Sequence, residues 1–138
     1  MNKQRVLFLC THNSARSQMA EGFLRALAGD RFEVASAGTE ATQVRPLAVK
    51  AMAEVGIDLS GHTSKTLDQF VNQPWDFVIT VCDAANEACP VFPAAAKRLH
   101  WSFPDPAVAR GSEDEKLAVF RDVRDGIRRR LEEWLRAS

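Results

Sequence analysis

The chain of 138 residues has no tyrosine, only three cysteines, no excess of charge of either sign and no long apolar run. Lysine plus arginine number 18, and so do aspartate plus glutamate. No overall field therefore attracts nucleic acid or an anionic membrane surface, and any anion site must be local. The apolar run at residues 6–9 is too short for a signal-peptide core or a membrane span. We expect a cytoplasmic protein that binds neither nucleic acid nor membrane.

Three cysteines are an odd number for a disulfide framework, and the chain is long enough to fold without one. In a reducing compartment such cysteines are more often free, catalytic or metal-binding. The chain has no C-x2-C pair, and its histidines, His12, His62 and His100, form no H-x3-H pair, so the spacing argues against zinc. We expect no metal, no cofactor, and a monomer whose one domain spans residues 1–138.

Apolar periodicity predicts an alternation of strands and helices. The strands are expected at residues 5–9, 32–37, 75–81 and 97–101, and the helices at residues 17–28, 46–55, 67–72 and 113–136. One or two helical turns are expected at residues 83–88. The last helix has an apolar stripe formed by Leu117, Phe120, Val123, Ile127, Leu131 and Trp134.

This alternation is typical of an α/β fold with parallel strands and right-handed crossovers. We predict a four-stranded parallel sheet of order 2-1-3-4 with helices on both faces. Its ligand site should lie where the order reverses, at the carboxyl ends of the first and third strands. Cys10 follows the first strand and Cys82 the third. Neighbouring strands are ~4.8 Å apart, which suits the ~4.4–6.8 Å Cα separation of a disulfide.

The loop from Cys10 to Ser17 has a C-x5-R-S pattern between a strand and a helix. Successive N–H groups of such a loop can point inward as an anion nest, and the following helix adds its positive end. Arg16 can clamp two oxygens of an oxyanion, and the same positive surroundings favour a Cys10 thiolate nucleophile. Asn13 tolerates the left-handed backbone that such a curl needs, and Ser14 and Ser17 can hydrogen-bond within it. The alternative is a chance Cys and Arg in an ordinary loop.

Cys82 and Cys89 are seven residues apart, which is roughly 10 Å along a helix at ~1.5 Å per residue. That exceeds the ~7 Å limit for a disulfide, so the segment must unwind before they can bond. Its composition predicts a weak helix. We predict a relay in which Cys10 bonds the substrate, Cys82 attacks Cys10, and Cys89 attacks Cys82. The alternative for Cys82 alone is a small buried apolar residue.

Asp105 lies between two prolines after the fourth predicted strand, on the carboxyl side of the sheet. It can reach the oxyanion and supply a proton to a leaving oxygen, or it can simply form a turn. His12 and His62 are expected to make structural hydrogen bonds.

The C-x5-R-S loop and the late D-P resemble low-molecular-weight protein tyrosine phosphatases. More closely, CTHNSARSQMAEG, SAG, HTS, VCDAANEACP and HWSFPDPA resemble thioredoxin-coupled arsenate reductases on the same fold. The resemblance implies Cys10 as nucleophile, Cys82 and Cys89 as relay, Asp105 as assisting acid and thioredoxin as reductant. It implies that the Thr11 hydroxyl favours the Cys82 thiolate. The oxyanion site that it implies consists of Thr11, His12, Asn13, Ser14, Ala15, Arg16 and Ser17.

Some members of that family bind potassium beside the loop, and four residues here match their site: Asn13, Glu21, Ser36 and Thr63. Where those members have an acidic ligand, this chain has Lys65. We expect its ammonium to replace the ion and to pair with Glu21, with His62 as a further supporting residue. Many relatives have a cysteine where this chain has Ala15, so a competing thiol is removed.

The function implied is reduction of arsenate, or binding of a phosphate-like oxyanion, through the three cysteines. One alternative is a phosphatase acting on phosphotyrosine or small phosphate esters with the same loop. The D-P motif of the phosphatases is often followed by tyrosine, whereas this chain reads Asp105-Pro-Ala and has no tyrosine. A second alternative is a redox-switched binding protein, and a third is a reductase coupled to glutathione or mycothiol.

Overall fold

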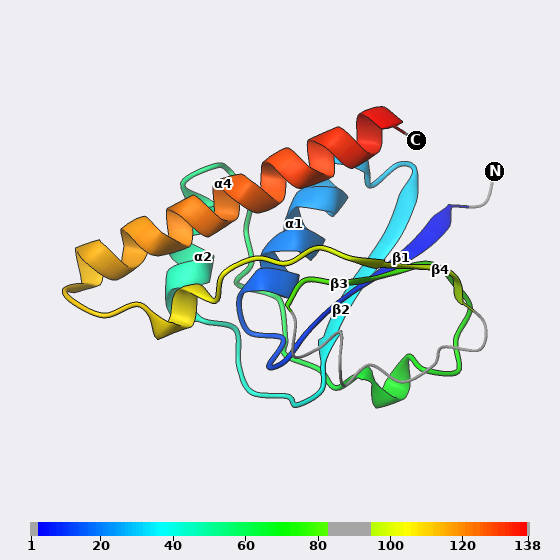
Figure 1. Ribbon diagram of the computed structural model, residues 1–138, viewed down its shortest axis with the longest axis horizontal. Helices are drawn as coiled ribbons and strands as arrows, with labels where there is room; N and C mark the ends of the chain where they lie inside the picture. The colour runs from blue at the N-terminus through cyan, green and yellow to red at the C-terminus, as the bar shows by residue number, and fades with distance from the viewer. Residues whose placement is uncertain (1–2, 83–94, 138) are drawn as a thin grey trace.

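The structure is a computed structural model, and it describes residues 3–82 and 95–137. The described elements follow one another along the chain as alternating strands and helices (Figure 1). They are β1 (Gln4–Cys10), α1 (Arg16–Ala28), β2 (Phe32–Gly38), α2 (Pro46–Ala53), the 3-10 turn η1 (Leu67–Gln69), β3 (Trp75–Thr80), β4 (Ala95–His100), the 3-10 turn η2 (Pro106–Val108) and α4 (Glu113–Ala137).

The four strands form a parallel sheet of order β2-β1-β3-β4, as the sequence predicts. Strand β1 lies between β2 and β3, and residues 6–9 are buried on both faces of the sheet. That burial explains why β1 is a continuous apolar run rather than an alternating one. The order places the ends of β1 and β3 side by side, at the reversal of the strand order.

Helices α1, α2 and α4 pack on one face of the sheet, with α4 running across the top in Figure 1. The predicted stripe of α4 is buried there from Leu117 to Leu131, and Trp134 is partly buried among aromatic rings. On the opposite face, the described residues form a smaller core around Leu7, Leu9 and Trp75, next to η1. The helix predicted at residues 67–72 is only this 3-10 turn. The carbonyl of Phe70 accepts the Trp75 indole N–H at 3.0 Å and the Gln73 N–H at 3.0 Å, so it is not left for a longer helix.

The other predicted boundaries agree to within two residues. Strand β3 ends at Thr80 although hydrogen bonding continues, since Val81 donates to Leu9 and Trp101 donates to Thr80, both at 2.8 Å. The turns predicted at residues 83–88 lie outside the described residues. Within residues 3–82 and 95–137, no helix has the length and apolar character needed to cross a membrane.

Candidate active site

The loop between β1 and α1 curls at the carboxyl edge of the sheet. Asn13 has φ of 50°, the left-handed conformation predicted for the curl, and it is fully buried. Gly38, at the end of β2, makes room for the loop: a Cβ there would lie 2.7 Å from the Thr11 carbonyl oxygen and 2.8 Å from the Asn13 nitrogen. Backbone bonds from Glu40 to Thr11 (2.9 Å) and from Arg45 to Ser14 (2.8 Å) hold the loop from outside. The curl is therefore fixed by its neighbours before any ligand binds.

Cys10 ends β1 and lies at the base of the loop with its side chain buried. The Ser17 hydroxyl at the start of α1 lies 2.8 Å from the Cys10 sulfur. Asn13 Nδ2 donates to the Ser17 oxygen at 2.8 Å, so the hydroxyl hydrogen of Ser17 is left to donate to the sulfur. A donor aimed at sulfur stabilises a thiolate. This geometry is what a cysteine nucleophile needs.

Cys82 lies two residues beyond the end of β3, the strand adjacent to β1. Its side chain is buried, as is that of Cys10. The Thr11 hydroxyl lies 3.4 Å from the Cys82 sulfur, which is the contact expected if Thr11 favours a Cys82 thiolate. The two cysteines thus lie at the carboxyl ends of neighbouring strands, at the same edge of the sheet. Cys89 lies outside the described residues.

Arg16 and Asp105 meet beside the loop. Arg16 Nη2 lies 3.6 Å from Asp105 Oδ2, and Arg16 Nη1 donates to the Phe103 carbonyl at 3.2 Å. The other carboxylate oxygen, Asp105 Oδ1, accepts the Ala107 N–H at 2.9 Å and opens η2. Asp105 therefore forms the turn that the sequence allows, and its other oxygen lies beside Arg16. Its role as an acid stays a prediction.

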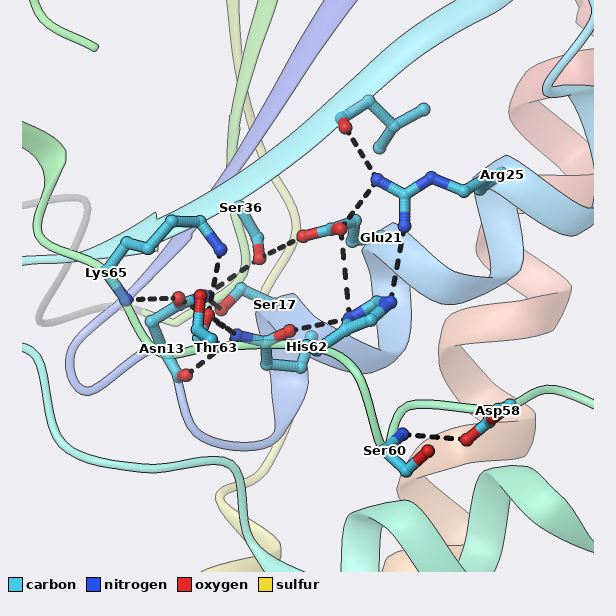
Figure 2. Close-up of polar contacts among 12 residues, drawn as sticks. Asn13, Ser17, Glu21, Arg25, Ser36, Asp58, Ser60, His62, Thr63 and Lys65 are labelled. Atoms are coloured by element: carbon cyan, nitrogen blue, oxygen red, sulfur yellow. Dashed lines mark hydrogen bonds and ion pairs between the residues drawn. The ribbon is translucent and has the colours of Figure 1, made fainter. Parts of the chain in front are cut away.

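A buried polar network lies behind the loop (Figure 2). Glu21 is 5% exposed, accepts the Ser36 hydroxyl at 2.5 Å and pairs with Arg25 at 2.7 Å. The predicted ion pair of Lys65 with Glu21 is wrong. Lys65 Nζ donates to the Thr63 carbonyl at 2.8 Å, while the cation at Glu21 is the Arg25 guanidinium, which reaches it from one turn further along α1. The structure does bring Lys65 to the loop through its backbone, which donates to Asn13 Oδ1 at 2.9 Å.

The histidines have structural contacts of different kinds. His62 lies in the network behind the loop, where its Nδ1 is 2.9 Å from Gln18 Oε1. Burial lowers the pKa of His62 below its ordinary value, and Arg25 acts in the same direction while Glu21 opposes it. His12 is half exposed, with Nδ1 3.4 Å from a Glu40 carboxylate oxygen.

Gln18 and Arg25 are two members of this network that sequence reasoning missed. Gln18 is fully buried, and its Nε2 is 3.0 Å from Asn13 Oδ1 and 2.9 Å from the Thr63 carbonyl. The i,i+4 spacing of Glu21 and Arg25 on a predicted helix was the available signal for the ion pair. Nothing in the pattern marked Gln18, because a polar residue in the first turn of a helix is ordinarily exposed.

A hollow of about 270 Å³ opens beside the loop between α2, η2 and α4. Arg45 and Pro46 border it on the loop side, and Pro106 and Ala107 border it next to Asp105. Phe120 is the one aromatic residue among the described residues that line it. Among its described lining residues this hollow therefore combines apolar side chains with charged ones, Arg45, Glu113 and Lys116, and it lacks the several aromatic residues expected of a phosphotyrosine site.

Comparison with known proteins shows which family this chain resembles along its length. The family pattern of the low molecular weight phosphotyrosine protein phosphatases matches residues 5–138. An arsenate reductase of Halalkalibacterium halodurans is 53% identical over 131 residues, which is 95% of this chain and 94% of that protein. The solved structure of an arsenate reductase in its phosphate-binding state has a TM-score of 0.83 and 36% identity, covering 97% of this chain and 98% of the other.

A thioredoxin-dependent arsenate reductase of Corynebacterium glutamicum has a TM-score of 0.71 and 29% identity, covering 99% of this chain and 64% of the longer one. These findings confirm the resemblance to arsenate reductases that the sequence motifs indicate. The chain belongs to the low molecular weight phosphotyrosine protein phosphatase family.

Proposed function

We propose that this protein reduces arsenate to arsenite and is regenerated by thioredoxin. The observation that carries the proposal is the placement of two buried cysteines at the oxyanion loop: Cys10 ends β1, and Cys82 lies two residues beyond the end of the adjacent parallel strand β3. A hydrolase needs only the first of them. The whole-length similarity to arsenate reductases supports the same conclusion.

In the first step the arsenate lies in the loop, with backbone N–H groups and Arg16 around its oxygens. The Cys10 thiolate attacks arsenic, and one arsenate oxygen leaves as water after taking up protons. Asp105 is the proposed proton donor, since Oδ2 lies 3.6 Å from Arg16 and the carboxyl group is therefore close to the oxygens that Arg16 would hold. The Ser17 hydroxyl, 2.8 Å from the sulfur, holds the thiolate in place for the attack.

In the second step the Cys82 thiolate attacks the Cys10 sulfur. The S–S bond forms as the S–As bond breaks, and its electron pair stays on arsenic, which leaves as arsenite. The Thr11 hydroxyl at 3.4 Å supports Cys82 as the attacker, because a donor there stabilises a thiolate. Cys89 then attacks Cys82, forming a Cys82–Cys89 disulfide and releasing the Cys10 thiolate.

Thioredoxin is the proposed reductant of that last disulfide: its dithiol is oxidised as Cys82 and Cys89 return to thiols. Support comes from the similarity to a reductase described as thioredoxin-dependent. A cycle of this kind requires a reducing compartment, so the proposal includes a cytoplasmic location.

Hydrolysis of phosphate esters is the second candidate function. The family match favours it, as do Cys10, Arg16 and Asp105, which a phosphatase would use as nucleophile, clamp and acid. Two observations argue against an aromatic substrate. The sequence has no tyrosine, and Phe120 is the one aromatic residue among the described residues that line the adjoining hollow.

The test is steady-state arsenate reduction with thioredoxin, thioredoxin reductase and NADPH, beside hydrolysis of p-nitrophenyl phosphate. The reductase proposal predicts arsenate-dependent NADPH oxidation that is lost in Cys10→Ser, Cys82→Ser and Cys89→Ser. Phosphatase activity should be weak, and it should depend on Cys10 but not on Cys82 or Cys89. Efficient ester hydrolysis without arsenate reduction would establish the phosphatase instead.

A further inference from the structure

Arg25 lies on α1 outside the oxyanion loop, with 48% of its side chain exposed. Its guanidinium nevertheless reaches three groups of the network behind the loop (Figure 2). Nη2 contacts Glu21 Oε2 at 2.7 Å and the Val34 carbonyl at 2.9 Å, and Nη1 lies 3.3 Å from His62 Nε2. Neither the loop motif nor the proposed catalytic steps give the Arg25 side chain a role.

The first branch of hydrogen bonds runs from Arg25 to the catalytic sulfur through Glu21. A carboxylate only accepts, so the Ser36 hydroxyl donates to Glu21 Oε1 and is free to accept from Asn13 Nδ2 at 2.9 Å. The second hydrogen of Asn13 Nδ2 goes to Ser17. The Ser17 hydroxyl then has its own hydrogen for the Cys10 sulfur.

The second branch runs through His62 and ends at the other side of the same amide. A guanidinium only donates, so His62 Nε2 accepts from Arg25, and the ring hydrogen is on Nδ1. Nδ1–H donates to Gln18 Oε1 at 2.9 Å, and Gln18 Nε2 donates to Asn13 Oδ1 at 3.0 Å. The Nδ2 and the Oδ1 atoms of the Asn13 amide therefore each have a fixed hydrogen-bond partner in one of the two branches.

Arg25 also suppresses a competing arrangement. His62 Nδ1 lies 3.8 Å from Glu21 Oε2, the oxygen that Arg25 binds. Without the guanidinium, the ring N–H can turn from Gln18 to that carboxylate. The second branch then loses its direction, and the first loses the partner that holds its carboxylate in place. The charged or titratable groups that face Glu21 are Arg25 from its own helix and His62 from the neighbouring connection. Lys65 points its ammonium at the Thr63 carbonyl.

We propose that Arg25 is a positioning residue for the Cys10 thiolate: it is the fixed donor from which both branches start. It holds the Glu21 carboxylate that directs the first branch, and it fixes the His62 tautomer that directs the second. The inference rests on the part of the proposed function that makes Cys10 the reactive thiol. It does not depend on arsenate as the substrate.

The test measures the ultraviolet absorbance of the Cys10 thiolate across the pH range in Cys82→Ser/Cys89→Ser protein, in which Cys10 is the remaining thiol. Where the thiol predominates, Arg25→Met should leave about 3- to 10-fold less thiolate than the parent protein. Arg25→Lys should retain most of the parent's thiolate, since an ammonium can still pair with Glu21. The matched control is Arg128→Met: Arg128 also pairs at i,i+4, with Glu132 at 3.8 Å, and is 46% exposed. It should leave the thiolate absorbance unchanged.

The route is tested by a double-mutant cycle with Glu21→Gln. If the effect passes through Glu21, adding Arg25→Met to Glu21→Gln should remove much less thiolate than Arg25→Met does alone. An unchanged thiolate absorbance in Arg25→Met, or a loss of full size in the Glu21→Gln background, overturns the inference. Arg25→Gln replaces Arg25→Met if the latter does not fold, as judged by circular dichroism. Failure of the proposed function is a separate result: the wild type would then show no arsenate-dependent NADPH oxidation, while the effect of Arg25→Met on the Cys10 thiolate would remain.

Discussion

Replacing Ser17 with alanine should change the reactivity of Cys10 in a way that a folding defect cannot imitate. Ser17 is fully buried, and its hydroxyl, 2.8 Å from the sulfur, is the donor that the Asn13 amide directs at Cys10. A hydrogen bond to a charged group is worth about 1.5–3 kcal/mol. Its loss therefore makes the thiolate about 10- to 100-fold less favoured relative to the thiol.

The consequence for rate has two parts, because a more basic thiolate is also a better nucleophile, with a Brønsted coefficient of ~0.4–0.5. Where the thiol predominates, alkylation of Cys10 by iodoacetamide should slow by about 3- to 10-fold, since the loss of thiolate outweighs the gain in nucleophilicity. At higher pH, where the thiolate predominates in both proteins, the rate should instead rise by about 3- to 10-fold.

The assay is the rate of modification of the Cys10 peptide, followed by mass spectrometry across the pH range, with the exposed Ser60→Ala variant as control. The buried Asn13 N–H that loses its acceptor should also lower the free energy of unfolding by about 1–3 kcal/mol. An unchanged pH profile, or a fall in rate on both limbs, would refute the assignment of Ser17 as donor to the thiolate.

Three further predictions concern the supporting structure. Ser112 and Glu115 cap α4 reciprocally: the Glu115 N–H donates to the Ser112 hydroxyl at 3.1 Å, and the Ser112 N–H donates to Glu115 Oε1 at 3.2 Å. Ser112→Ala should lower the free energy of unfolding in urea by about 1 kcal/mol and leave arsenate turnover unchanged. A loss of turnover would contradict this. Hydrogen bonds from Arg121 and then Arg124 lower the pKa of Glu54 from 4.5 to about 2. The stabilisation from the ionised Glu54 side chain is therefore present above pH 4.5 and disappears as the pH falls through about 2. Between these pH values the thermal midpoint of Glu54→Gln should fall less steeply than that of the wild type, and parallel curves would contradict the assignment. Because the Arg25 guanidinium already pairs with Glu21, potassium should raise the thermal midpoint no more than sodium does, and a selective effect of potassium would show that a cation site remains.

The sequence predicted the fold because its strands are strongly marked. Residues 6–9 and the β-rich run from Trp75 read as buried parallel strands, and the alternation with helices leaves few topologies once right-handed crossovers are required. The position of Cys10 and Cys82 at one edge followed from that order alone. Strand ends were less certain, because hydrogen bonds such as that from Trp101 to Thr80 continue past the last regular residue.

The contacts behind the loop were harder to predict, because they depend on which side chain reaches a given point. Lys65 and Arg25 both lie near Glu21, and only the three-dimensional arrangement decides that the guanidinium from one helical turn away takes the carboxylate. The role of Gln18 depends in the same way on the position of Thr63, which is distant in sequence. Local pattern specifies the loop, and tertiary packing specifies its support.

The central claim is that the oxidation passes from Cys10 to Cys82 and then to Cys89, so that the Cys82 and Cys89 thiols supply the two electrons that reduce arsenic. A single turnover measures it directly. Reduced protein is mixed with arsenate in the absence of thioredoxin, and disulfides and arsenite are then quantified together by mass spectrometry. The account predicts one arsenite per protein and a Cys82–Cys89 disulfide in the wild type, with a Cys10–Cys82 disulfide accumulating in Cys89→Ser. Arsenite formed without either disulfide would contradict it.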